Sequence, residues 1–249
     1  VVAIIFTHSH VDHFGGATAI ASPEDVAAGK VRVIAPAGFL EEATSENILA
    51  GPAMGRRAIY MYGRDLPRSE RGKVDNGLGK EPAMGTIGIL RPTELVDRTP
   101  QTVDVDGVEF IFQYTPGSEA PAEMTFYLPA KKAFCGAEVM SRTLHNLYTL
   151  RGAKVRDANR WSGYIDDAID RFPGSEVMFF SHHWPVFGKD RIAALMKDQR
   201  DTYRYIHDQT LRLANQGHGP REIAEQIKLP KSLTRHWWNR DYYGTVKHD

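Results

Sequence analysis

Hydrophobic residues in this chain gather in short runs, and most of these runs end in a cluster of polar residues. Residues 1–6 form a continuous, β-branched run that predicts a buried strand. An Asp106-Gly107 pair separates two later runs and predicts the turn of a hairpin. On the same grounds we predict further strands at residues 31–35, 102–105, 109–114, 125–128, 133–135 and 176–180.

Stretches with helical spacing alternate with these strands and then replace them. Residues 51–88 are rich in glycine, proline and charge, and they predict a long loop. Because the pattern becomes wholly helical toward the C-terminal end, we expect two domains, at residues 1–195 and 196–249. The predicted helices are residues 14–20, 38–49, 159–172, 192–214 and 220–227.

Charge and cysteine content narrow the classes of function. The 249 residues include 31 Lys and Arg against 31 Asp and Glu, so no overall field favours nucleic acid, and we expect no nucleic-acid partner. Cys135 is the only cysteine, which excludes an internal disulfide framework and leaves the cellular compartment open. No run approaches the roughly 20 apolar residues of a membrane span. The chain has no start methionine or signal peptide, and we expect it to be a fragment of a longer protein.

A cluster of metal-binding side chains, THSHVDH, follows the first predicted strand. Two histidines two positions apart on extended backbone point the same way, while the Asp-His pair belongs to the turn into a helix. Imidazole and carboxylate without thiolate are typical of a catalytic zinc site with an open position. The alternatives are a chance histidine cluster and a solvated polar turn. The motif predicts a dinuclear metal centre with the ligands His8, His10, Asp12 and His13.

A dinuclear centre needs further ligands from the ends of other strands. Glu119, Glu138 and His182 each come just after a predicted strand, where loops at one rim of a sheet reach a shared point. We favour His182 over His183, which alternation would place on the opposite face. Taken singly, these carboxylates and Glu123 would more often be solvated loop residues.

Several motifs together resemble the alkylsulfatase branch, the type III sulfatases, of the metallo-β-lactamase superfamily. They are THSHVDHFGG, PGSEAPAEM, CGAE, TLHNLYTLRGAKVRD, SHHWPVFG, DQRDTYRYIHDQTLRLAN and NRDYYGTV, and they cover nearly the whole chain. The resemblance implies an α+β fold, a metallo-β-lactamase-like αββα sandwich without its N-terminal strands, followed by the start of an all-helical dimerisation domain. It also implies a homodimer.

The resemblance further implies zinc-dependent hydrolysis of alkyl sulfate esters to an alcohol and inorganic sulfate. Two Zn²⁺ ions per subunit would activate a water. The first ion would be held by residues matching His8, His10 and Glu119. The second would be held by Asp12, His13 and a histidine of SHHW, with Glu138 between the ions.

A second constellation bears on the substrate. Asn146, Arg151 and Arg156 fall within eleven residues, and guanidinium forks with an amide donor suit the oxygens of a sulfate ester. In the family, the matching residues hold the sulfate, whereas the alternative is a surface turn whose arginines pair with Asp157 or Glu138.

The sequence says less about which residues donate a proton to the leaving alcohol and which ones contact the alkyl group. If the S–O bond is cleaved, a proton donor at the ester oxygen assists, and His248, Tyr242 and Tyr243 are candidates. Cleavage of the C–O bond releases sulfate and needs little acid, and the sequence leaves both routes open. We expect residues 51–88 and the helices after residue 195 to line an apolar pocket or a subunit interface.

Two other classes of function remain as alternatives. One is a different hydrolase of the superfamily, such as a β-lactamase, lactonase or thioesterase, which would leave Asn146, Arg151 and Arg156 without a role. The other is a catalytically silent module that binds metal or mediates dimerisation.

Overall fold

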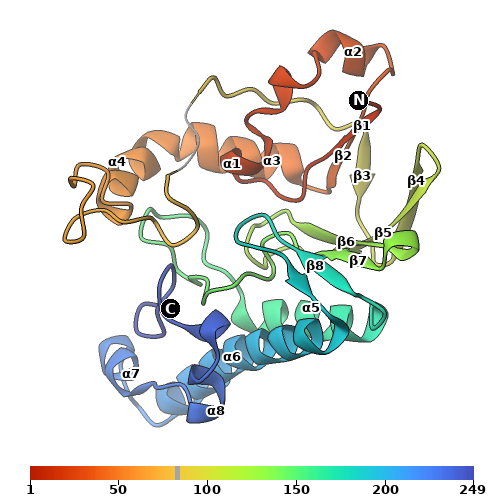
Figure 1. Cartoon of the computed structure of the whole chain (residues 1–249). Helices are drawn as coiled ribbons and strands as arrows, with labels where there is room; N and C mark the ends of the chain where they lie inside the picture. The colour runs from red at the N-terminus through yellow and green to blue at the C-terminus, as the bar shows by residue number, and fades with distance from the viewer. Residues whose placement is uncertain (82–84) are drawn as a thin grey trace.

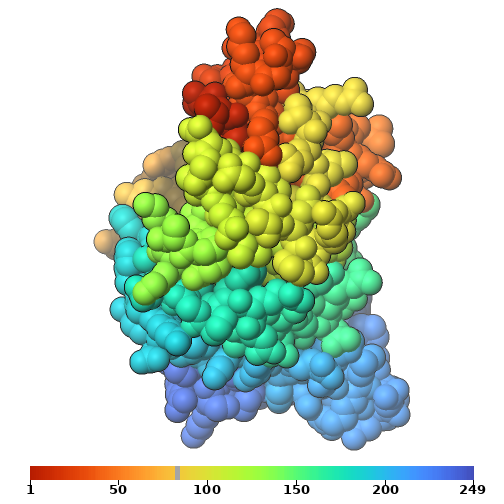
Figure 2. Space-filling view, turned by 90° about the vertical axis from the view of Figure 1, so that its right-hand side faces the viewer, coloured from red at the N-terminus to blue at the C-terminus, as the bar shows by residue number. Residues whose placement is uncertain are grey.

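The computed structural model describes residues 1–81 and 85–249 of the chain. Two β-sheets lie face to face in the middle, and helices cover the outer face of each sheet, as Figure 1 shows. In Figure 2 the layers follow one another along the molecule, from the N-terminal residues at one end to the C-terminal helices at the other. This arrangement confirms the predicted α+β sandwich.

The first sheet has three parallel strands in the order β1-β2-β3. The strands are β1 (Ala3–Ile5), β2 (Arg32–Pro36) and β3 (Glu94–Val96). Val33 and Ile34 are fully buried, as expected for a parallel strand covered on both faces. Strands β1 and β2 match the predictions, whereas β3 was not predicted, because three residues carry too little alternation to be distinguished from a loop.

The second sheet has six strands in the order β4 to β9, antiparallel except for the parallel β7-β8 pair. The predicted turn is present: Asp106 and Gly107 both have positive φ, 53° and 77°, as a tight hairpin requires. Of the six strands, only the two-residue β9 was not predicted. They are β4 (Gln101–Val105), β5 (Val108–Tyr114), β6 (Met124–Leu128), β7 (Ala133–Cys135), β8 (Val177–Phe179) and β9 (Val186–Phe187).

Two predictions fail among the helices on the first sheet. The helix predicted at residues 14–20 is wrong, because Gly15 and Gly16 separate α1 (Val11–Phe14) from a 3₁₀ turn. The loop predicted at residues 51–88 is wrong in its first part, which forms α4 (Gly51–Met61). A proline in the first turn starts this helix, and Met54 is buried under it. Residues 82–84 of that predicted loop lie outside the described residues. The other helical segments are α2 (Pro23–Ala27), α3 (Phe39–Thr44) and a π-helical turn (Ser45–Leu49).

Long helices cover the second sheet and lead into the C-terminal region. Helix α5 (Ala158–Arg171) packs along α6 (Lys189–Asn215), and Trp161 stacks on Tyr203 with ring centroids 4.4 Å apart. Helix α6 runs continuously through residue 195, where the domain boundary was predicted. Two short helices follow, α7 (Pro220–Gln226) and α8 (Lys231–Thr234). Within the described ranges, none of the helices is long and apolar enough to cross a membrane.

Each interface between layers has its own buried cluster. Phe6, Phe14 and Phe39 pack between the first sheet and its helices, with the Phe6 and Phe39 rings stacked 4.9 Å apart. A second cluster, which includes Ile34 and Phe112, lies between the two sheets. A third cluster, centred on Trp161, lies between the second sheet and α5 and α6. The sheets are therefore held on both faces, which fixes the loops at their rims.

The C-terminal segment returns to the middle of the molecule (Figure 1). The backbone N–H of Gly244 donates to the carbonyl of Leu144 at 2.9 Å, and a Cβ atom at residue 244 would lie 2.5 Å from the backbone nitrogen of Asn146. Only glycine allows this approach. It places the neighbouring Tyr243 beside the site described next.

Candidate metal centre and its cavity

The histidine motif connects the first sheet to the second. His8 and His10 lie on extended backbone after β1, as predicted, whereas Asp12 and His13 lie within α1 itself and not in a turn before it. His8 forms an isolated antiparallel bridge with Glu123, and the N–H of Met124 donates to the carbonyl of Thr7 at 2.9 Å. The backbone itself therefore brings the motif against the loop between β5 and β6.

The first group of possible ligands is buried. The Oε2 atom of Glu119 lies 2.9 Å from Nδ1 of His10 and 3.7 Å from Nε2 of His8. The Oε2 atom of Glu138 lies 3.2 Å from Nε2 of His8. Each of the four residues thus offers one ligand atom to a common point.

The second group lies nearer the surface. Nε2 of His182 is 3.1 Å from Nε2 of His13 and 3.4 Å from Oδ2 of Asp12. Oε2 of Glu138 is also 3.1 Å from Nε2 of His13, so one carboxylate oxygen faces both groups. The structure therefore brings together all seven residues that we predicted as metal ligands.

The neighbouring histidine points elsewhere. His183 has positive φ, 71°, and its Nε2 atom lies 3.0 Å from the backbone carbonyl of Gly77. His182, the favoured candidate, is the one in the ligand cluster.

The donor atoms fit divalent metal ions. Nε2 of His8 and Oε2 of Glu119 are buried and find no hydrogen-bond partner among residues 1–81 and 85–249. Such orphaned atoms are costly unless something else satisfies them. Imidazole and carboxylate donors with no thiolate suit zinc, and their division into two groups suits two ions.

Without a metal ion, the buried histidines and glutamates of the cluster shift one another's pKa values. Burial opposes the charged form of His10, but the Glu119 and Glu46 carboxylates outweigh it and raise the pKa of His10 to about 9. Burial and the nearby His13 lower the pKa of His8 to about 4. The pKa of Glu138 is held well below its usual range, because the neighbouring His13, His145 and His8 outweigh the effect of burial. In the metal-free chain, His10 is thus held as the cation.

A buried carboxylate outside the ligand set holds the two glutamate loops. Oε2 of Glu123 accepts hydrogen bonds from the N–H groups of Glu119 and Ala120, at 2.9 and 3.0 Å. Its Oε1 atom accepts one from the N–H of Glu138 at 3.1 Å. Burial and the charge of Glu119 raise the pKa of Glu123, and the hydrogen bonds that Ala120 and Ser118 donate to it oppose this rise.

Two basic side chains lie behind the ligand carboxylates. Arg156 donates to the carbonyl and Oε1 of Glu119 and to the carbonyl and Oδ1 of Asn146, through its Nε, Nη1 and Nη2 atoms. His145, which the sequence analysis did not single out, lies with Nε2 3.1 Å from Oε1 of Glu138. Its position in the apolar stretch beside Asn146 was the available signal.

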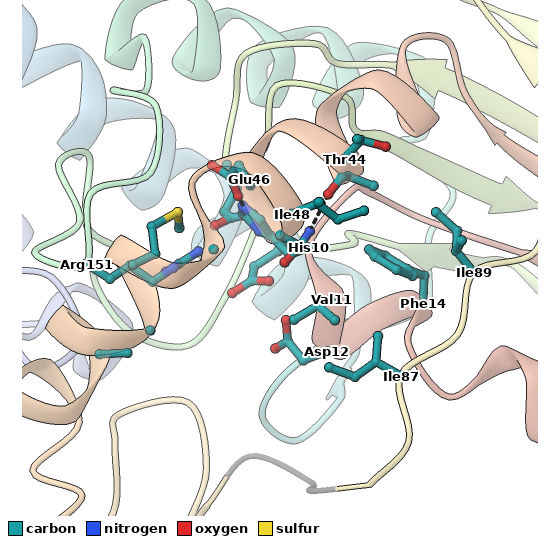
Figure 3. A pocket seen from close by; sticks show the side chains of 18 of the residues that line it. His10, Val11, Asp12, Phe14, Thr44, Glu46, Ile48, Ile87, Ile89 and Arg151 are labelled. Carbon is teal, nitrogen blue, oxygen red and sulfur yellow. Dashed lines mark hydrogen bonds and ion pairs between the residues drawn. The ribbon is translucent and has the colours of Figure 1, made fainter.

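A cavity of about 650 Å³ opens beside the cluster. In Figure 3, Arg151 lies at one end, His10 and Glu46 in the middle, and apolar side chains at the other end. Arg151 lies within hydrogen-bonding distance of Tyr243, whose hydroxyl is 3.4 Å from Nη1 of Arg151 and 3.3 Å from the hydroxyl of Tyr62. Away from Arg151, the apolar wall is formed by Val11, Phe14, Ile48, Ile87 and Ile89, while Met54 and Ala58 of α4 also line the cavity.

The remaining predicted site residues lie at different places. Among the three predicted sulfate-binding residues, only Arg151 lines this cavity; Asn146 lines a smaller neighbouring cavity of about 240 Å³, and Arg156 is buried behind Glu119. His248 is exposed at the smaller cavity, with Nδ1 2.7 Å from the hydroxyl of Thr245. Tyr243 lines both cavities, so it is the candidate proton donor nearest to Arg151.

Comparison with known proteins places this geometry in a family. The profile described as "Metallo-beta-lactamase superfamily" matches residues 1–182, which carry both ligand groups. The chain belongs to the metallo-β-lactamase superfamily. In this superfamily member, residues 219–249 match a second profile, "Alkyl sulfatase dimerisation", over α7, α8 and the C-terminal segment.

The curated relatives of this metallo-β-lactamase superfamily protein include alkylsulfatases. A linear primary-alkylsulfatase from Pseudomonas sp. is 50% identical over 250 residues, covering 100% of this chain and 37% of that protein. An alkyl/aryl-sulfatase from Saccharomyces cerevisiae is 48% identical, covering 99% of this chain and 38% of that protein. The chain therefore spans less than two fifths of the length of these relatives.

Solved structures agree with the fold. A stereoselective inverting sec-alkylsulfatase from Pseudomonas sp. superposes with a TM-score of 0.97 at 45% identity, covering 100% of this chain and 40% of that chain. A metallo-β-lactamase family protein from Thermus thermophilus, 18% identical, superposes with a TM-score of 0.52 over 100% of this chain and 73% of that chain. The predicted metallo-β-lactamase-like fold is confirmed.

Proposed function

We propose that this protein hydrolyses alkyl sulfate esters to an alcohol and inorganic sulfate, with two zinc ions held by the ligand cluster. One observation carries the proposal: the cavity that reaches the ligand cluster has a guanidinium, Arg151, at one end and an apolar wall at the other. An alkyl sulfate is an anion joined to an apolar chain. The similarity to alkylsulfatases over the whole length of this chain supports the same substrate class.

The residues that would hold the ions fall into the two observed groups. His8, His10 and Glu119 would hold one ion, and Asp12, His13 and His182 the other. Glu138 would contact both, which its distances of 3.2 and 3.1 Å to His8 and His13 support. When bound, zinc supplies Lewis acidity and lowers the pKa of a water toward about 7.

The chain's own residues would orient the ester. Arg151 offers fixed N–H donors to the sulfate oxygens, and two guanidinium donors match two oxygens of one group. Arg156 would act on Glu119 instead, because its donors are already committed to Glu119 and Asn146. Tyr243, within hydrogen-bonding distance of Arg151, would donate a proton to the leaving oxygen if the S–O bond breaks.

The apolar wall would take the alkyl chain. Phe14, Ile87 and Ile89 lie at the end of the cavity away from Arg151 (Figure 3). Burying each methylene there contributes about 0.8 kcal/mol, so the wall would favour esters of longer alcohols.

The C-terminal helices support a further expectation about assembly. Residues 219–249 match a dimerisation profile, and we propose that the protein functions as a homodimer. The balanced charge gives no reason to expect a nucleic-acid partner.

A panel of substrates tests the proposal. The purified protein is assayed with dodecyl sulfate, a β-lactam and an acyl thioester, with and without a chelator. We expect sulfate release from dodecyl sulfate alone, lost with the chelator and in His10→Ala. Turnover of the lactam or thioester without sulfate release would instead show another hydrolase, and zinc binding without any turnover would show a silent module.

A further inference from the structure

Glu46 is a buried carboxylate that touches the ligand cluster from outside. Its Oε2 atom lies 3.1 Å from Nε2 of His10. On the other side of the same ring, Nδ1 of His10 lies 2.9 Å from Oε2 of Glu119 and faces the ligand atoms. The two nitrogens of His10 therefore have different neighbours, one inside the cluster and one outside it.

The local backbone explains why an acidic residue points inward here. Helix α3 ends at Thr44 and continues as a π-helical turn over Ser45–Leu49. A π turn widens the helix by one residue and is frequent at functional sites. Within this turn Glu46 is buried, whereas Ile48 and Leu49 are exposed. The reversal of the usual preference indicates that the carboxylate has a specific role inside.

We propose that Glu46 is a positioning residue that fixes His10 in the tautomer with the proton on Nε2 and the lone pair on Nδ1. A neutral imidazole carries one N–H, and a metal ligand must present a lone pair. A carboxylate opposite Nε2 stabilises the N–H at that position and leaves Nδ1 free for the metal. This inference rests on the proposed zinc centre.

The surroundings of Glu46 leave it free for this contact. Among the described residues, His10 is the only ion-pair partner of Glu46. Nε2 of His10 and Oε1 of Glu46 are both buried and make no hydrogen bond within the described ranges, so Oε2 of Glu46, at 3.1 Å, is the acceptor placed nearest to that ring nitrogen. The contact with His10 is therefore the one that holds this carboxylate in place.

Zinc affinity distinguishes positioning from simple packing. Glu46→Ala removes the acceptor, and Glu46→Gln keeps an amide oxygen that accepts from Nε2. Glu41→Ala, an exposed position on the preceding helix α3, is the matched control. Competition with a chelator should show zinc binding about 10- to 100-fold weaker in Glu46→Ala, as for other partners of metal-bound histidines, and within about threefold of wild type in Glu46→Gln and Glu41→Ala.

A spectroscopic measurement covers the case in which Glu46→Ala fails to fold. In zinc-loaded wild type and Glu46→Gln, ¹⁵N shifts of the His10 ring should show a protonated Nε2 and a metal-bound Nδ1. The inference would be overturned if the wild-type protein showed the opposite tautomer. It would also be overturned if Glu46→Ala bound zinc as tightly as wild type, or if Glu46→Ala and Glu46→Gln lost the same zinc affinity. Zinc affinities decide the role of Glu46 even if dodecyl sulfate is not hydrolysed, whereas a wild-type protein that binds no zinc would overturn both proposals.

Discussion

His8 and Glu123 form an isolated β-bridge between the loop after β1 and the start of β6. The same Glu123 accepts hydrogen bonds from the backbones of Glu119 and Glu138. Three possible metal ligands from three separate loops are thus tied to one residue that is not itself in the ligand set. Glu123 therefore connects the three loops that carry these ligands.

Replacing this carboxylate with an amide is expected to loosen the centre. In Glu123→Gln, an N–H₂ group faces the N–H donor of Glu138 or those of Glu119 and Ala120, whichever way the amide turns. We expect a loss of about 1–3 kcal/mol in the free energy of unfolding, as for other unsatisfied buried groups, together with weaker zinc binding. Urea unfolding and chelator competition measure these effects.

Glu109→Gln is the matched control for this substitution, because Glu109 is exposed on β5. It should change neither quantity. Equal behaviour of the two variants would show that Glu123 does not hold the glutamate loops.

Substitutions of Arg151 and Arg156 should differ in their effects on turnover and on zinc content. Arg151 lines the cavity, so Arg151→Ala is expected to lower kcat/KM for dodecyl sulfate by about 100-fold or more while zinc content stays the same. Arg156→Ala leaves the Glu119 carboxylate without its buried partner, so zinc content and turnover should fall together. Metal analysis beside sulfate release distinguishes these outcomes. Parallel losses in Arg151→Ala would make that arginine structural.

A larger side chain at the apolar end of the cavity tests whether the alkyl chain binds there. Ile89 lines the end of the cavity away from Arg151, and Ile89→Trp fills part of that end. In wild type, each added methylene should raise kcat/KM by about fourfold, the equivalent of about 0.8 kcal/mol, up to the length of the wall. In the variant this increase should stop at a shorter chain, while hexyl sulfate keeps its rate. A uniform decrease across hexyl to dodecyl sulfates would place the alkyl chain elsewhere.

Stability of the metal-free protein should depend on the charge of His10. Its pKa is raised from 6.5 to about 9 by Glu119 and Glu46 against the effect of burial. The stabilisation is therefore complete below about pH 6.5 and is lost as the pH rises through about 9. The difference in unfolding free energy between wild type and His10→Gln, measured without metal, should shrink between about pH 6.5 and about pH 9.5. A difference that stays constant or grows would contradict this assignment.

Much of the sandwich could be predicted from the sequence, because its strands end sharply at polar clusters. The THSHVDH motif marked the end of β1, and Glu119, Glu138 and His182 were found as the polar residues after apolar runs. These signals are local. They depend on alternation and on strand ends, which the sequence displays directly.

The parts that were missed depend on contacts between distant segments. Helix α4 was assigned to a loop because its glycines and charges hide a helix that Met54 anchors. Glu46 resembles any other acidic residue of an amphipathic helix, and only the π turn points it at His10. The contact of Arg156 with Glu119 spans 37 residues of sequence, and no local pattern distinguishes Arg156 from Arg151.

Zinc titration of the metal-free protein, with sulfate release from dodecyl sulfate followed at each step, tests the central claim most directly. We predict no release before zinc is added, a rise that reaches its plateau at two zinc ions per chain, and loss of that rise in His13→Ala. Full sulfate release from the metal-free protein, or a rate that does not respond to zinc, would contradict a two-zinc alkylsulfatase centre.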